Sequence, residues 1–261
     1  MAQNTAGMRA LRVVVVHGGP GAAGELAHLA AELSARGHAT LEPWQTATSV
    51  SGQIGELAQA IAADCAPPVV LIGWSWGAWL AALTAQARSD LVAHLVLVGS
   101  GPLGATAADS TQITRRARLG EKAWREMRAA FADPGGLHRG MDLLSQADDY
   151  DPLDTPLPAI SHDPDIHRQV WAEARALRAS GALLERVGQI TCPITVIHGS
   201  YDPHPAAGVI VPLKARLPAA EIVLLRHCGH TPWRERRAQA PFFATLERVI
   251  AGALGGQTPS A

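Results

Sequence analysis

The sequence lacks the features that mark several classes of protein. Its 261 residues include only three cysteines, which are widely spaced and form no CxxC pair, so neither a disulfide framework nor a thiolate metal site is indicated. No apolar run approaches the ~20 residues that a membrane-spanning helix needs, and the first ten residues contain no secretory apolar core. We therefore expect reduced cysteines, no bound metal, and a cytoplasmic protein without a membrane partner.

A strong charge of one sign is missing as well. The chain has 22 Lys and Arg residues against 23 Asp and Glu residues, a formal net charge of −1. This balance gives no reason to expect nucleic acid as a partner and favours a small-molecule substrate, while the oligomeric state stays open. The most basic stretch, residues 115–128, is interleaved with Glu121 and Glu126, which predicts a solvated helix face rather than a phosphate site.

Short apolar runs alternate with amphipathic stretches along much of the chain. Before residue 99 the pattern predicts strands at 11–16, 39–42, 69–72 and 91–98, and helices at 24–36, 54–63 and 76–87. After residue 193 it predicts strands at 194–198 and 221–225, and helices at 206–217 and 240–251. Strands that alternate with helices predict the α/β class, with a mostly parallel sheet and helices on both of its faces.

A proline-containing segment interrupts this alternation. It has helical patterns at 111–131, 136–146 and 165–187. We interpret the segment as an inserted helical cap. The expected division is a core formed by residues 8–101 and 191–254, and a cap formed by residues 102–190.

The most informative stretch joins the predicted strand at 69–72 to the helix that follows it. It reads Gly73-Trp74-Ser75-Trp76-Gly77, a GxSxG pattern in the strand, turn and helix context of a nucleophile elbow. Such a turn is sharp and pushes its serine out over the sheet, and glycines on either side leave room for it. The N-terminal dipole of the following helix favours negative charge beside the serine. Ser75 is therefore the candidate nucleophile.

Two later loops supply a candidate base and its carboxylate partner. Asp202 and His230 each follow a predicted strand, and open α/β sheets place their sites at the carboxyl ends of strands. The order Ser, Asp, His along the chain is that of a hydrolase triad on such a sheet. His230 would act as the base and Asp202 would fix its tautomer. His204 and His227 are the competing histidines.

A glycine-rich loop, HGGPG at residues 17–21, follows the first predicted strand. Glycine lets a backbone N–H group face a substrate oxygen without a side chain in the way. We expect the N–H groups of Gly19 and Trp76 to form an oxyanion hole. A phosphate-binding loop is disfavoured because the GxxxxGK[ST] pattern is missing and Pro20 lacks an N–H group. We interpret His17 as a structural residue of this loop.

Together these motifs support a family resemblance. The HGGPG loop, the GWSWG elbow, Asp202 and the CGHTPW segment around His230 resemble the α/β-hydrolase superfamily, and within it the proline iminopeptidase-like group. The resemblance covers residues 11–98 and 193–251, and it implies an α/β-hydrolase fold with an inserted cap. The implied reaction is hydrolysis of an ester or amide through an acyl-enzyme, which requires no metal or organic cofactor.

Three interpretations of the function remain open. Trp74 and Trp233 are expected to border a pocket for an apolar group, which suits a serine hydrolase of small esters or amides. An aminopeptidase of the proline iminopeptidase type would need cap carboxylates for the substrate's ammonium group, such as Glu173 or those at 148–151. We interpret these acids as solvated cap surface instead. The third interpretation is a non-enzymatic ligand-binding receptor on a hydrolase fold.

Overall fold

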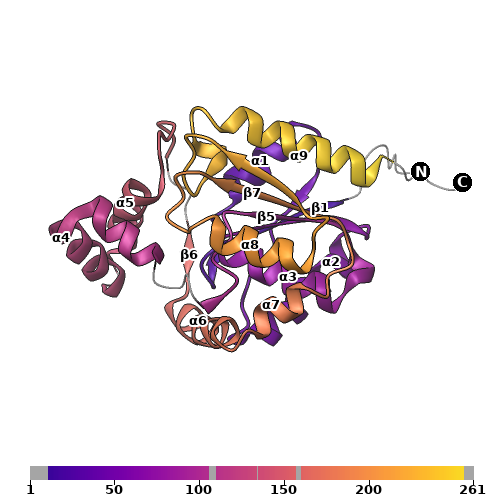
Figure 1. Cartoon of the computed structure of the whole chain (residues 1–261), viewed down its shortest axis with the longest axis horizontal. Coiled ribbons are helices and arrows are strands. Elements are labelled where there is room, and N and C mark those ends of the chain that lie inside the picture. Colours follow the sequence, from indigo (N-terminus) through magenta and orange to yellow (C-terminus); the bar gives the residue numbers. More distant parts are fainter. Residues whose placement is uncertain (1–10, 106–109, 134, 157–159, 256–261) are drawn as a thin grey trace, which may run out of the picture.

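A six-stranded sheet lies at the centre of the molecule (Figure 1). The computed structural model describes residues 11–105, 110–133, 135–156 and 160–255, so the expected first core residue, Met8, lies outside it. The strands run in the order β3-β1-β4-β5-β7-β8, and every neighbouring pair is parallel. Their bounds are β1 Val13–Val16, β3 Thr40–Leu41, β4 Val69–Trp74, β5 Val92–Val98, β7 Ile194–Gly199 and β8 Glu221–Leu225.

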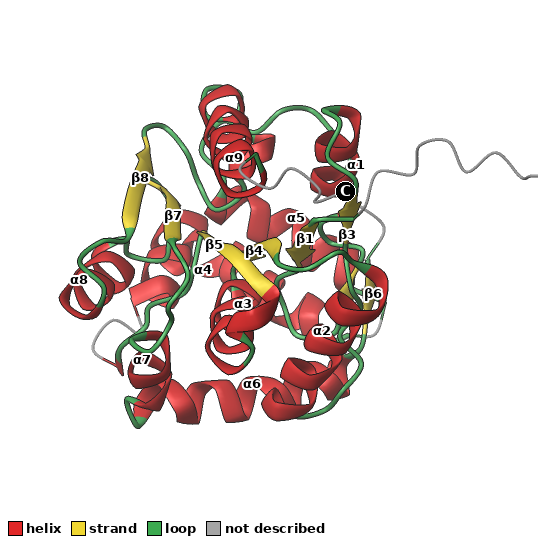
Figure 2. Cartoon of the chain, turned by 90° about the vertical axis from the view of Figure 1, so that its right-hand side faces the viewer, coloured by secondary structure: helices red, strands yellow, loops and turns green. Residues whose placement is uncertain are grey.

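Helices cover both faces of the sheet (Figure 2). One face carries α1 Ala27–Ala35 and α9 Gln239–Leu254, and the other carries α2 Val50–Asp64, α3 Trp76–Ala87 and α8 Ala207–Arg216. Side chains of β1 alternate between the two apolar clusters: Val13 and Val15 join one, Val14 and Val16 the other. A strand that is buried on both faces has to be apolar throughout. The predicted α/β class and parallel sheet are therefore confirmed.

A helical insertion follows β5 and projects beyond one end of the sheet (Figure 1). It contains α4 Ser110–Ala132, which is bent at Gly120, and α5 Leu137–Asp148. Next come α6 Pro164–Ala179 and α7 Ala182–Val187, where one continuous helix at 165–187 was predicted. That prediction is wrong because Gly181 has a φ of 84° and ends the first helix. Within the described residues, no helix has the length and apolar character needed to cross a membrane.

The segment between β5 and β7 is fastened to the core next to the carboxyl ends of the strands. The short strands β2 Ala22–Ala23 and β6 Ser161–His162 pair antiparallel and join the loop after β1 to the start of α6. The buried carboxylate of Glu235 accepts the backbone N–H groups of Gly229, Tyr150 and Asp151, each at 2.7 Å. These bonds hold the chain after α5 against the loop that carries His230.

Candidate active site

The turn between β4 and α3 has the geometry of a nucleophile elbow. Ser75 has φ 57° and ψ −118°, a conformation that residues with a side chain rarely adopt. A Cβ atom on Gly73 would lie 2.2 Å from the carbonyl oxygen of Gly77, and one on Gly77 would lie 2.1 Å from that of Val16. Because no side chain fits at such distances, both glycines of the GxSxG pattern are required for this turn.

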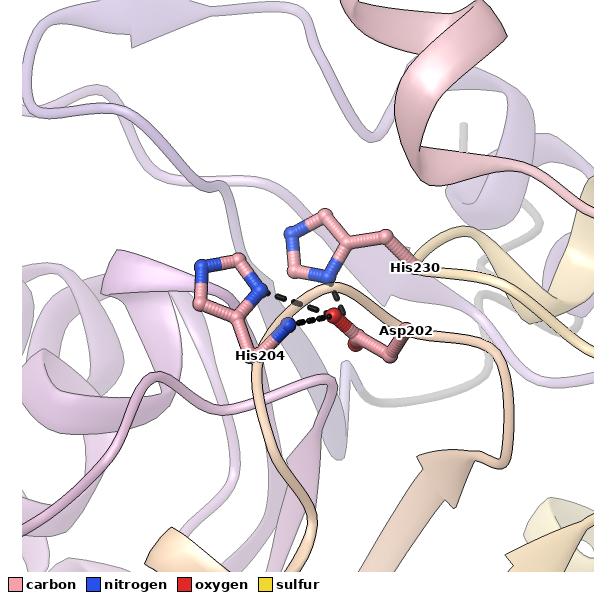
Figure 3. Close-up of side chains that lie close together, drawn as sticks. All are labelled: Asp202, His204 and His230. Carbon is pink, nitrogen blue, oxygen red and sulfur yellow. Dashed lines mark hydrogen bonds and ion pairs between the residues drawn. The ribbon is translucent and has the colours of Figure 1, made fainter. Parts of the chain in front are cut away.

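Asp202 and His230 lie in neighbouring loops after β7 and β8, and Asp202 Oδ2 is 2.8 Å from His230 Nδ1 (Figure 3). Burial works to raise the pKa of the Asp202 carboxyl, but the imidazoles of His230 and His204 outweigh it and hold that pKa well below its ordinary value. An ionised carboxylate can only accept hydrogen bonds, so His230 carries its proton on Nδ1. Its Nε2 atom is then the one available to accept a proton.

His230 is held in place from several sides. The indole N–H of Trp74 donates to the His230 carbonyl oxygen at 2.8 Å, and the two ring centroids are 4.9 Å apart. The His230 N–H donates to the carbonyl oxygen of Asp148 at 3.0 Å. Burial works to lower the pKa of His230, but the charge of Asp202 and its hydrogen bond raise that pKa above the ordinary value. The ring is therefore both fixed in orientation and made more basic.

Gly99, directly after β5, is a part of the site that sequence reasoning missed. Its φ is +52°, and a Cβ atom there would lie 2.9 Å from His230 Nδ1 and 3.2 Å from Asp202 Oδ2. Glycine at this position leaves room for the histidine and aspartate to meet. Its place at the carboxyl end of a predicted strand was the only signal in the sequence.

His204, one of the two competing histidines, binds the same carboxylate as His230. Its backbone N–H and its Nδ1 atom are each 2.8 Å from Asp202 Oδ1 (Figure 3). Burial lowers the pKa of His204 to about 4, so its ring is neutral and donates through Nδ1. The other competitor, His227, lies against the ring of Tyr150 with the centroids 5.3 Å apart. The contact between His204 and Asp202 was not predicted from the sequence.

The ligand atoms of Asp202, His204 and His230 lie within 4.8 Å of one another, a spacing at which such groups can hold a metal ion. In the structure the Nδ1 atoms of both histidines face the carboxylate at hydrogen-bonding distance. A metal held by these Nδ1 atoms would have to replace both of those hydrogen bonds. The arrangement observed is that of two imidazole donors on one acceptor.

A cavity of about 900 Å³ opens beside this group. The sequence-predicted residues that line it are Ser75, His230, Gly19, Trp76, Trp74 and Trp233, while Asp202 lies behind His230. The insertion contributes a largely apolar wall made of Trp124, Met127, Phe131, Leu137, Met141 and Leu144. The cavity thus brings the candidate nucleophile, the candidate base and an apolar surface together.

The basic segment of α4 is not simply the solvated face that the sequence predicted. Arg115 makes a bidentate ion pair with Asp148 at 2.8 and 2.5 Å, and both side chains are largely buried. Arg118 donates to the carbonyl oxygens of Ala147 and Tyr201, each at 2.7 Å. The prediction is wrong for Arg115 and Arg118 because α4 packs on α5 and on the loop of Asp202, so these two arginines contact a carboxylate and carbonyl oxygens instead of water. The other charged residues of the stretch, such as Arg116, are exposed as predicted.

The acids considered for an aminopeptidase form more hydrogen bonds and ion pairs within the protein than expected. Glu173 accepts the N–H of Val50 at 2.8 Å, at the start of α2, and lies away from the cavity wall. Asp149 does line the cavity, where it accepts a hydrogen bond from Ser145 and burial raises its pKa. The interpretation as solvated cap surface is therefore wrong for Asp148, which is paired with Arg115, and for Asp149, which is also buried, whereas Glu173 is exposed as predicted.

Glu25 is a further carboxyl on the cavity wall, and sequence reasoning did not single it out. It lies beside Trp74 and the HGGPG loop, since a Cβ atom on Gly18 would be 2.8 Å from both Glu25 Oε2 and the Trp74 ring. Burial raises the pKa of Glu25 to about 8. This carboxyl is therefore mostly neutral at pH values below about 8.

Comparison with solved structures supports the fold. The chain is similar to a candidate lipase from Acinetobacter baumannii AYE, with 16% identity, a TM-score of 0.68, and coverage of 94% of this chain and 85% of that one. A carboxylesterase from Nitrososphaera gargenis matches with 17% identity, a TM-score of 0.63, and coverage of 95% and 93%. The 2-hydroxy-6-oxo-6-phenylhexa-2,4-dienoate hydrolase from Rhodococcus sp. strain RHA1 matches with 18% identity, a TM-score of 0.57, and coverage of 94% and 90%. At such low identities these similarities establish the fold alone.

Comparison with sequences is more specific about the family. No curated protein matches the chain. None of the three structures above is a proline iminopeptidase, so that narrower resemblance stays a prediction. The sequence model of the alpha/beta hydrolase family matches residues 13–242, a span that contains all six strands of the sheet and the three candidate triad residues. The chain therefore belongs to the alpha/beta hydrolase family.

Proposed function

We propose that the protein is a serine hydrolase that cleaves a small ester or amide through an acyl-enzyme intermediate. One observation carries this proposal: the strained elbow serine, Ser75, lines the same cavity as His230, whose Nδ1 is hydrogen-bonded to the buried, ionised Asp202. A serine hydroxyl is a weak nucleophile, and a neighbouring neutral imidazole with a fixed tautomer is the group that activates it.

The reaction would begin when Nε2 of His230 takes the hydroxyl proton and Ser75 Oγ attacks the carbonyl carbon. The negative charge that develops on the carbonyl oxygen would be stabilised by the N–H groups of Gly19 and Trp76. Trp76 is the first residue of α3, where backbone N–H groups have no partner within the helix. His230 then gives the proton to the leaving group, and the acyl group stays on Ser75.

Water completes the cycle by the same steps. His230 takes a proton from the water molecule as its oxygen attacks the acyl carbon, and Ser75 recovers the proton when the carboxylic acid leaves. The charge of Asp202 stabilises the imidazolium form of His230 at each stage. The apolar wall of the insertion, with Trp74 and Trp233, would hold an apolar part of the substrate.

The aminopeptidase interpretation receives less support from the site. An α-ammonium group that is taken out of water needs a carboxylate partner. Glu173 lies away from the cavity wall, and Asp148 is already paired with Arg115. This leaves Glu25 and Asp149, whose pKa values burial raises. The receptor interpretation is also weaker, since binding alone requires neither a strained serine nor an oriented histidine.

A panel of 4-nitrophenyl acyl esters and aminoacyl 4-nitroanilides tests the proposal, and a fluorophosphonate probe tests the nucleophile. We expect esters without an amino group to turn over at least as well as the anilides, and the probe to label Ser75. Ser75→Ala should keep the folded circular dichroism spectrum and lose on the order of 10³-fold or more in kcat. Ser89→Ala, at an exposed serine, is the matched control.

Two outcomes would contradict the proposal. Full activity of Ser75→Ala, or a label on another residue, would show that the nucleophile is misassigned. A clear preference for aminoacyl anilides that disappears in Glu25→Gln or Asp149→Asn would make the protein an aminopeptidase instead.

A further inference from the structure

Exposed arginines line the cavity as well as apolar side chains. Arg128 of α4 and Arg168 and Arg175 of α6 are part of its wall. Because these side chains are exposed, they lie where the cavity opens to solvent. The apolar wall and the basic groups therefore belong to one cavity but differ in their access to water.

The helical repeat of α6 explains why its arginines face the cavity. The residues of α6 that line the cavity are spaced at helical intervals on one face: Pro164, His167, Arg168, Trp171 and Arg175. The residues of its other face, Ile166, Val170 and Ala174, are buried in the core. Packing against the core thus fixes which face of α6 is turned to the cavity.

The carboxyls on the same wall do not neutralise this positive charge. They are Glu25, Asp148 and Asp149. Asp148 is held in a bidentate ion pair by Arg115. Burial raises the pKa of Glu25 to about 8 and raises that of Asp149, which disfavours a negative charge on either group.

The exposed arginines themselves have few acidic partners. Arg168 forms a surface ion pair with Asp165 at 2.7 Å, in which both side chains are about two-thirds exposed. Ion pairs with such exposure are weak and readily exchanged. In the described part of the chain, no carboxylate forms an ion pair with Arg128 or Arg175. An excess of positive charge therefore remains at the opening of the cavity.

We propose that the substrate is an anionic amphiphile, an ester or thioester that joins an apolar chain to a carboxylate or phosphate group. This inference rests on the proposed function and names the substrate class of the same site. The apolar chain occupies the wall of the insertion, while Arg168 and Arg175 contact the anion from α6 and Arg128 from α4. Guanidinium groups bind carboxylate and phosphate with two parallel hydrogen bonds, and a positive opening attracts anions from solution.

Two pairs of matched substrates test the inference and locate the anion. Octanoyl-N-acetylcysteamine and octanoyl-coenzyme A share the acyl group and the thioester, but only the second carries phosphates on its leaving group. Both 4-nitrophenyl octanoate and mono-4-nitrophenyl octanedioate release nitrophenol, but only the second has a carboxylate at the end of its acyl chain. A preference for the anionic member of the first pair would place the anion on the leaving group, and a preference in the second pair would place it on the acyl chain.

The double variant R168Q/R175Q removes two of the three arginines, and R216Q/R237Q makes the same change in net charge at exposed arginines away from the cavity. We expect kcat/KM for the preferred anionic substrate to fall about tenfold in the first variant and by less than about twofold in the second. Turnover of the neutral partner should hardly change. Raising NaCl from ~20 to ~300 mM should likewise lower the ratio of kcat/KM for the anionic substrate to that for its neutral partner.

Failure of the inference and failure of the proposed function give different results. If Ser75 supports turnover of neutral esters but neither pair shows an anionic preference that R168Q/R175Q reduces, the inference is wrong and the proposed function stands. If no ester or thioester is cleaved, the proposed function is wrong. Calorimetry of octanoyl-coenzyme A and octanedioate with Ser75→Ala then tests the inference by itself. A Kd weakened about fivefold by R168Q/R175Q supports it, and absence of binding by both anions overturns it.

Discussion

His204 and His230 share one carboxylate, since their Nδ1 atoms each lie 2.8 Å from a different oxygen of Asp202. The centroids of the two rings are 4.6 Å apart. Both imidazole N–H groups donate to the same negatively charged carboxylate, so the strength of one hydrogen bond depends on the other. His204 is therefore placed to position Asp202 and to moderate its effect on His230.

Removal of the His204 ring should shift the pH profile of the enzyme. In His204→Ala, Asp202 loses one hydrogen-bond donor, so the carboxylate charge interacts more strongly with His230 and raises the pKa of His230 further. The ascending limb of the kcat/KM profile should therefore move to higher pH. The loss of a positioning hydrogen bond should also lower kcat/KM by about tenfold. In His204→Asn an amide N–H can replace the Nδ1 donor, so this variant should restore much of the wild-type profile.

His227→Ala is the matched control for His204, because it removes a histidine that the cavity wall does not include. Its pH profile should match that of the wild type. An unchanged profile in His204→Ala would show that His204 has only a structural role.

The wild-type pH profile should reflect the raised pKa of His230. The imidazole must be neutral to accept the serine proton, so kcat/KM should rise with pH as His230 loses its proton. Because the charge of Asp202 outweighs burial and raises this pKa, the midpoint should lie above the ordinary histidine value of about 6.5. Asp202→Asn removes that charge and should move the midpoint down. A flat profile from acid to neutral pH would count against His230 as the base.

A methyl group at Gly99 should damage the site more than the fold. In Gly99→Ala the new Cβ atom would lie 2.9 Å from His230 Nδ1, so the histidine and aspartate must move, and we expect a loss of about 10² or more in kcat. Gly181→Ala is the control, because Gly181 also has a positive φ but no atom lies within 4 Å of its Cβ position. Gly181→Ala should lose about 1 kcal/mol of stability in urea unfolding from backbone strain, and Gly99→Ala should lose at least as much because the buried His230 must also move. Equal kcat values for the two variants would contradict this role of Gly99.

The parts of the molecule that were predictable from the sequence are those determined by local constraints. Strands buried on both faces, such as β1 and β4, must be apolar at every position, and this produces runs that are easily recognised. The turn at Ser75 requires glycine at positions 73 and 77 because the backbones approach too closely for any side chain. Such requirements leave a pattern within a few residues.

The parts that were not predictable depend on partners far away in the chain. Alternating charges on a helix look the same whether the helix faces water or another helix, so the pairing of Arg115 with Asp148 left no local signal. The same holds for the half-buried Glu25 and the fully buried Glu235, whose surroundings follow from the way distant loops meet. The break at Gly181 did have a local signal, since glycine within a helical pattern is unfavourable.

The stability of the fold should depend on pH through Glu25. Burial raises its pKa in the folded protein to about 8, against about 4.3 in an unfolded chain. Between these values the folded state holds one more proton, so the contribution of Glu25 to the free energy of unfolding falls as pH rises, by up to about 1.4 kcal/mol per pH unit. The variant Glu25→Gln keeps the size and shape of the side chain but has no group that titrates.

In urea unfolding from pH ~5 to ~8, Glu25→Gln should gain stability relative to the wild type as pH rises. Asp64→Asn, at an exposed carboxyl, is the control. A difference between Glu25→Gln and wild type that stays constant with pH would contradict the prediction.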